Sequence, residues 1–145
     1  MTQQEKDLLL KDLCARLPYG VKVCINLPNH QEKMFEEQIG DLKELTIYGG
    51  YLVNSKGIDY RSFKLDIKPY LRSMSSMTEE ESKEFSTFYD EFEPDDYWKP
   101  GHYAKYIGID LIDEYVDWLN AHHFDYRGLI EKGLAIEAPE GMYSY

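Results

Sequence analysis

The stretch LTIYGGYLVNSKGIDYRSFKLDIKP, residues 45–69, alternates short apolar runs with turn-forming residues. Gly49 and Gly50 separate two apolar runs, which predicts a tight hairpin. The Asn-Ser-Lys-Gly sequence at 54–57 predicts a second turn, and apolar and polar residues then alternate from 60 to 67, as in a half-buried strand. The stretch therefore predicts antiparallel strands joined by short turns.

The strand pattern extends toward the N-terminus. Val21, Val23 and Ile25 alternate with polar or small residues, which predicts another half-buried strand. Residues 30–40 fit either a short helix or an extended loop. We therefore expect a small antiparallel β-meander over about residues 20–68.

A helix is predicted before this meander. Thr2 followed by Glu5 forms a capping-box sequence, and leucines then recur at helical spacing. Pro18 and Gly20 end the predicted helix.

Helices are also predicted after the meander. Thr78 and Glu81 form a second capping-box sequence, and residues 109–122 present one apolar and one acidic face. Residues 134–138, LAIEA, predict a short final strand. The order of helix, strands, helices and short strand predicts an α+β fold in which the C-terminal helices pack against the sheet.

The composition predicts a single domain, residues 1–145, because 145 residues are enough to bury a core without a metal or disulfide. The sequence has no signal-peptide pattern and no apolar run of membrane-spanning length. Its two cysteines lack CxxC spacing, which suits a reducing compartment. We therefore expect a cytoplasmic protein without a cofactor and without a membrane partner.

The net charge of −11 is concentrated in one segment, since residues 79–97 contain nine acidic residues and one basic residue. Direct nucleic-acid binding is disfavoured, because it requires clustered lysine and arginine. A basic protein is the natural complement of such a segment.

Aromatic side chains are interleaved with the acids in this region, and aromatic residues commonly anchor interfaces. A second interpretation is a solvated acidic face whose aromatic residues belong to the core. The thirteen tyrosines also fit a contact between copies in a homo-oligomer. The candidate partner-binding residues are Tyr89, Glu91, Phe92, Glu93, Asp95, Asp96, Tyr97 and Trp98.

His122, His123 and Asp125 are the candidate metal-binding or acid–base residues. A structural interpretation competes with this one. Two histidines at a helix C-terminus interact favourably with the helix dipole, and Asp125 can cap a short helix over 126–132 that Gly133 ends. Adjacent histidines on a helix diverge, whereas a chelating pair is separated by three or four residues. Because no nucleophile or phosphate-loop motif is present, the sequence predicts no catalytic residue and no metal ligand.

Two stretches carry a resemblance: IKPYLRSMSSMTEEE at 67–81 and DWLNAHHFDYRGLIEKGLAIEAPEGMY at 117–143. Together they resemble a group of small uncharacterised proteins from gut bacteria of the Bacteroides type and from their phages and prophages. The resemblance implies a cytoplasmic accessory protein encoded by a mobile element, and it implies no activity.

The leading hypothesis is a non-enzymatic interaction protein that binds a basic partner through the acidic aromatic region 79–98. The alternatives are a small metal-dependent or hydrolytic enzyme that uses His122, His123 and Asp125, and a homo-oligomeric structural protein.

Overall fold

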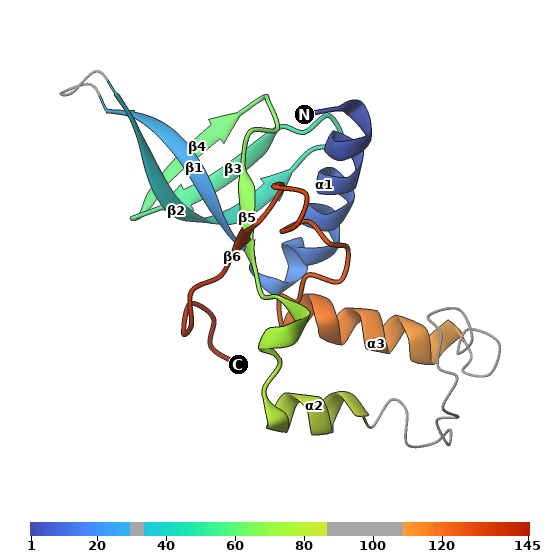
Figure 1. Ribbon diagram of the computed structural model, residues 1–145. Coiled ribbons are helices and arrows are strands. Elements are labelled where there is room, and N and C mark those ends of the chain that lie inside the picture. Colours follow the sequence, from blue (N-terminus) through green and yellow to red (C-terminus); the bar gives the residue numbers. More distant parts are fainter. Residues whose placement is uncertain (30–33, 87–108) are drawn as a thin grey trace.

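The computed structural model of the protein describes residues 1–29, 34–86 and 109–145 (Figure 1). One helix lies along one face of a six-stranded sheet, and the other helices lie beyond one end of that sheet. The architecture is the α+β fold expected from the sequence.

Helix α1 (Gln3–Arg16) begins with the predicted capping box. The Thr2 hydroxyl accepts a hydrogen bond from the Glu5 amide, and the Glu5 carboxylate accepts one from the Thr2 amide. The helix passes into the turn η1 (Leu17–Tyr19), and Gly20 then takes a φ of 74° that suits glycine. The predicted N-terminal helix is confirmed.

The strands form one sheet in the order β4-β3-β2-β1-β5-β6. Neighbouring strands are antiparallel except β5 and β6, which are parallel. The strand bounds are β1 (Lys22–Asn29), β2 (Met34–Leu45), β3 (Tyr51–Ser55), β4 (Ile58–Ser62), β5 (Lys68–Leu71) and β6 (Ile136–Glu137).

The two predicted turns join β2 to β3 and β3 to β4. Gly49 and Gly50 lie in the first turn, where the Thr46 amide donates to the Gly50 carbonyl at 2.8 Å. Lys56 and Gly57 form the second turn, with φ angles of 53° and 79°. Positive φ at both positions is the signature of the two-residue hairpin turn whose twist matches that of its strands.

Two segments differ from the expectation. Residues 34–40, which fitted a short helix or a loop, belong to the twelve-residue strand β2. The alternating run at 60–67 is not one strand, because β4 ends at Ser62 and β5 begins at Lys68. The Lys64 amide donates to the Ser62 hydroxyl at 3.2 Å, a local turn that competes with strand pairing.

The hydrophobic core lies between α1 and the sheet, and residues from the C-terminal part complete it. Leu9 and Leu13 of α1 face Val23 and Val53 of the sheet, together with Leu129. Beside β3, the packing leaves no room for a side chain on Gly40 of β2, since a Cβ there would clash with Val53. The fully buried members of the core include Leu9, Leu13, Val21, Val23, Val53, Ile67, Leu71 and Leu129.

A buried ionic cluster joins α1 to the C-terminal part. Asp12 and Arg16 are both fully buried, and Arg16 Nε donates to the Asp12 carboxylate at 2.8 Å. Arg127 Nη1 donates to the other Asp12 oxygen at 2.8 Å, and Arg16 Nη2 donates to the Phe124 carbonyl at 2.7 Å. One carboxylate therefore serves two guanidinium groups that come from distant parts of the chain.

The helical part contains the turn η2 (Met74–Ser76), α2 (Glu79–Ser86) and α3 (Ile109–Ala121). Helix α3 ends within one residue of the predicted position. The short helix predicted over 126–132 is wrong, because this segment forms turns. Within the described ranges, no helix is long and apolar enough to cross a membrane.

Candidate binding cleft

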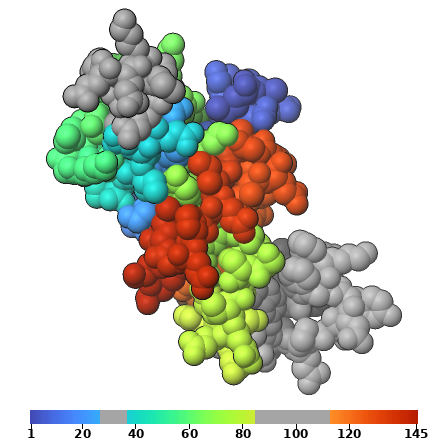
Figure 2. Space-filling view, turned by 60° about the vertical axis from the view of Figure 1, so that its left-hand side comes forward, coloured from blue at the N-terminus to red at the C-terminus, as the bar shows by residue number. Residues whose placement is uncertain are grey.

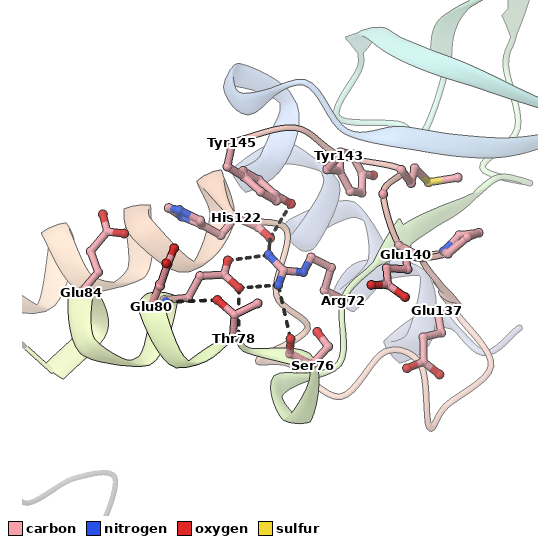
Figure 3. Close-up of a pocket in the computed structure, with 15 residues that line it drawn as sticks. Arg72, Ser76, Thr78, Glu80, Glu84, His122, Glu137, Glu140, Tyr143 and Tyr145 are labelled. Atoms are coloured by element: carbon pink, nitrogen blue, oxygen red, sulfur yellow. Dashed lines mark hydrogen bonds and ion pairs between the residues drawn. The ribbon is translucent and has the colours of Figure 1, made fainter.

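A cleft of about 800 Å³ opens between the start of α2 and the C-terminal segment, residues 137–145 (Figure 3). Figure 2 shows these two parts of the chain, yellow-green and red, on the same face of the molecule. The cleft is lined by Arg72, Ser76, Thr78, Glu80, Glu81, Glu84, His122 and residues 137–143 and 145.

Arg72 and Glu81 fix the first turn of α2 beside the end of β5. Arg72 Nη1 and Nη2 donate to the two Glu81 oxygens at 2.7 and 2.6 Å, and both side chains are largely buried. The Thr78 amide also donates to Glu81 in the second predicted capping box, and Thr78 accepts from the Glu81 amide. Hydrogen bonds from Arg72 are the main reason that the pKa of Glu81 is lowered to about 2. Burial of the carboxylate opposes this shift, and the hydrogen bonds from Thr78 add to it.

The C-terminal segment forms the opposite wall, and Tyr143 holds it in place. The Tyr143 ring stacks on His123 with centroids 3.6 Å apart and planes at 8°. Its hydroxyl donates to the Tyr70 carbonyl at 2.7 Å and accepts from the Lys22 amide at 3.0 Å. These contacts attach the segment to both β1 and β5.

Tyr145 attaches the same segment to the end of α3. Its hydroxyl donates to the His122 carbonyl at 2.8 Å and also lies 2.8 Å from His123 Nδ1. Its ring stacks on His122 with centroids 4.9 Å apart. Arg72 lies over the same ring, with its Cζ 5.2 Å from the centroid.

The rim of the cleft is acidic. Glu80 and Glu84 project from α2, and Glu137 and Glu140 lie on the opposite side, all four exposed (Figure 3). The cationic side chain among the lining residues is Arg72, and Glu81 already neutralises it. Carboxylates on both sides of a concave surface concentrate negative potential within it.

His123 is a buried histidine with an unusual backbone. It is 4% exposed and has a φ of 62°, at the residue where α3 gives way to the following chain. The His123 amide donates to the Asn120 carbonyl and the Phe124 amide to the Leu119 carbonyl, which is the hydrogen-bond pattern of a Schellman helix end. Burial lowers the pKa of His123 to about 4, against the hydrogen bond with the Gly20 carbonyl 3.1 Å from Nε2.

His122 and Asp125 lie in different surroundings from His123. The His122 ring stacks on Trp118 at 4.1 Å, and its Nδ1 donates to the Trp118 carbonyl at 2.9 Å. The Asp125 carboxylate accepts from the Leu129 and Ile130 amides, both at 2.9 Å, so it caps a turn.

The three candidate residues therefore do not converge on one point. Across residues 1–29, 34–86 and 109–145, no group of three histidine, cysteine, aspartate or glutamate side chains is placed to hold a metal ion. Each of the three has a local partner that accounts for its position, and only His122 lines the cleft.

The candidate partner-binding residues Tyr89, Glu91, Phe92, Glu93, Asp95, Asp96, Tyr97 and Trp98 lie outside the described residues. The first part of the predicted acidic region is described, and it supplies Glu80, Glu81 and Glu84 to the cleft. The sequence pattern does not pair Arg72 with Glu81. Nothing in the sequence pattern pointed to Tyr143 or Tyr145 as part of a site, since their role depends on the return of the chain to the sheet.

No protein-family model matches the chain, and no curated protein or solved structure shows significant similarity to it. A function has therefore to be inferred from the chemistry of the cleft.

Proposed function

We propose that this chain is a non-enzymatic interaction protein that binds a basic segment of a partner protein in the acidic cleft. The observation that carries the proposal is the placement of exposed carboxylates on both sides of one concave surface. Among the residues described, Glu80, Glu137 and Glu140 have no ion pair or side-chain hydrogen bond. Their charge is thus available to a ligand.

The spacing of these carboxylates favours an extended cation over a single metal ion. A calcium ion needs six to eight oxygen ligands converging within about 2.6 Å. The described part of the chain contains no such convergence. Separated carboxylates instead suit a peptide whose lysine or arginine side chains are themselves separated.

The aromatic wall of the cleft supports the same ligand class. Tyr145 is 60% exposed, so the part of its ring that His122 and Arg72 leave uncovered can contact a cationic side chain. Contacts between a cation and an aromatic face contribute about 0.5–1 kcal/mol at exposed sites. The acidic sequence continues beyond α2 to residue 98, and we include that segment in the proposed binding region.

We also propose the setting implied by the resemblance: a cytoplasmic accessory protein of a mobile element that acts on a host protein. An acidic surface with aromatic neighbours suits such a role, since charge complementarity speeds association with a basic partner.

The test is binding of fluorescently labelled oligolysine, measured by fluorescence anisotropy at low salt and at about 0.3 M salt. The variant Glu80→Gln/Glu137→Gln/Glu140→Gln is expected to weaken binding roughly tenfold, because each exposed ion pair contributes about 0.2–1 kcal/mol. The control variant Asp7→Asn/Glu114→Gln/Glu131→Gln removes the same charge from exposed residues outside the cleft.

Equal loss of affinity in both variants would show a general charge effect and overturn the cleft as the site. A further variant, Glu91→Gln/Glu93→Gln/Asp95→Asn/Asp96→Asn, tests the segment beyond α2. If it leaves oligolysine binding unchanged, the binding region is limited to the cleft.

A further inference from the structure

Strand β4 is one edge of the sheet and pairs only with β3 among the described strands. A two-residue turn makes Ser55 and Ile58 a hydrogen-bonded pair. Hydrogen-bonded and non-hydrogen-bonded pairs then alternate along the strand, so the backbone groups of Tyr60 point toward β3. Those of Asp59 and Arg61 point away from the sheet, where they can pair with another strand.

The side chains of Asp59 and Arg61 are both exposed and carry opposite charges. Asp59 accepts a hydrogen bond from Asn54 at 2.8 Å, and Arg61 donates to Glu44 at 3.1 Å. The Arg61–Glu44 pair is about half exposed, so it contributes little stability and leaves both groups hydrated. These contacts lie across the sheet face and leave the strand edge open.

Apolar side chains flank the same strand. Ile58 at its start is 55% exposed, and Phe63 just after its end is 84% exposed. Tyr48 is 89% exposed in the turn before β3. This turn lies at the Phe63 end of β4, because Tyr51 at the start of β3 pairs with Ser62. These apolar groups lie at both ends of the open edge, where a strand paired with β4 would cover part of their surface.

We propose that β4 pairs with β4 of a second copy of this chain, antiparallel and centred on Tyr60, joining two sheets into one. Charge complementarity identifies a second copy of the chain as the pairing partner. In this register Asp59 lies opposite Arg61 of the second copy, and Arg61 lies opposite its Asp59. Opposite charges directly across an antiparallel pair are stabilising.

The remaining pairs in this register are also favourable. Tyr60 lies opposite Tyr60 of the second copy, an aromatic pair. Phe63 comes next to Gly57 of the second copy, where the absence of a side chain leaves space for the ring.

Neighbouring symmetric registers are disfavoured by the same charges. Centring the pair on Asp59 places two carboxylates opposite one another, and centring it on Arg61 places two guanidinium groups opposite one another. Like charges directly across a strand pair are destabilising. The charges of the Asp-Tyr-Arg sequence therefore disfavour pairing with unrelated strands and favour pairing with β4 of a second copy.

The test is the molar mass in solution, measured by light scattering and sedimentation from about 10 µM to about 1 mM protein. The unmodified chain is expected to form a dimer as its concentration rises. Asp59→Arg and Arg61→Asp each create two like-charge pairs, so each variant is expected to dimerise at least tenfold more weakly. Circular dichroism checks that both remain folded.

The decisive measurement is a mixture of the two single variants. One chain then carries two arginines and the other two aspartates at positions 59 and 61, so the mixture is expected to form a heterodimer. The double swap Asp59→Arg/Arg61→Asp is expected to restore the homodimer. A monomeric unmodified chain at every concentration, or folded single variants that dimerise normally, would overturn the proposal, whatever the outcome of the oligolysine experiment.

Discussion

The imidazole of His123 lies flat against the ring of Tyr143, with ring centroids 3.6 Å apart. This stack joins the end of α3 to the C-terminal segment, and the Tyr143 hydroxyl extends the connection to the backbone of β1 and β5. The Tyr143 side chain therefore anchors the wall of the cleft to the sheet, while Tyr145 attaches it to the end of α3.

Tyr143→Phe is expected to lower the free energy of unfolding by about 1–3 kcal/mol. The ring stack survives, but the Tyr70 carbonyl and the Lys22 amide lose a partner in a partly buried place. Urea denaturation followed by circular dichroism measures the change. Tyr48→Phe, at a position that is 89% exposed, is the matched control and should leave the stability unchanged.

Acid is expected to destabilise the fold in two stages. The pKa of His123 is lowered from 6.5 to about 4, so the unfolded chain takes up a proton first, and stability is lost as the pH falls from about 6.5 to about 4. The pKa of Glu81 is lowered from 4.5 to about 2, so its contribution is lost as the pH falls from about 4.5 to about 2. Thermal melts across this range measure both stages.

Two variants separate these stages. His123→Asn, which tolerates the positive φ, should flatten the upper stage, and Glu81→Gln should flatten the lower one. An unchanged pH profile in His123→Asn would contradict the assignment of the upper stage.

Asp12→Ala is expected to cost about 3–5 kcal/mol of stability, because it leaves the fully buried Arg16 without its counter-ion. Arg127 loses the same partner. Chemical denaturation gives the value, and Asp7→Ala on the exposed side of α1 is the control, with an expected change within about 0.5 kcal/mol. A similar small loss in both variants would mean that the cluster does not stabilise the fold.

Gly40→Ala is expected to cost about 1–3 kcal/mol, since the added methyl group overlaps Val53. Combining it with Val53→Ala should recover part of that loss, because the overlapping side chain is removed. The Asn54 carbonyl also lies close to the new methyl group, at 2.9 Å, so recovery stays incomplete. A double-mutant cycle measures the coupling, and strictly additive losses would contradict the predicted clash.

The elements that depend on local chemistry could be predicted from the sequence. The capping boxes at Thr2 and Thr78 are present, and the Lys56–Gly57 turn has the expected backbone. Helix α3 could be predicted because its sequence has one apolar and one acidic face. This pattern forms a helix whichever part of the protein covers the apolar face.

What the sequence could not reveal depends on distant partners. Strand β2 lacks a clear alternation of residues, and its pairing with β1 over eight positions determines its conformation. The segment after Asp125 has helical periodicity. The Asp125 carboxylate nevertheless accepts hydrogen bonds from the amides four and five residues ahead and stabilises turns instead of a helix. The pairing of Arg72 with Glu81 could not be predicted for the same reason, because it depends on how the chain turns between β5 and α2.

The parallel pairing of Tyr70 with Ile136 has a consequence for the order of folding. Each of the strands β1 to β4 pairs with the strand that follows or precedes it in the sequence. Their contact order is therefore low, and they can form early. Strand β6 must return across the whole helical part before it pairs, and closing so long a loop has a high entropic cost. Leu129 and Leu134 lie just before β6 in the sequence and belong to the core. We therefore expect a late folding step in which these two side chains close an apolar groove between α1 and the sheet.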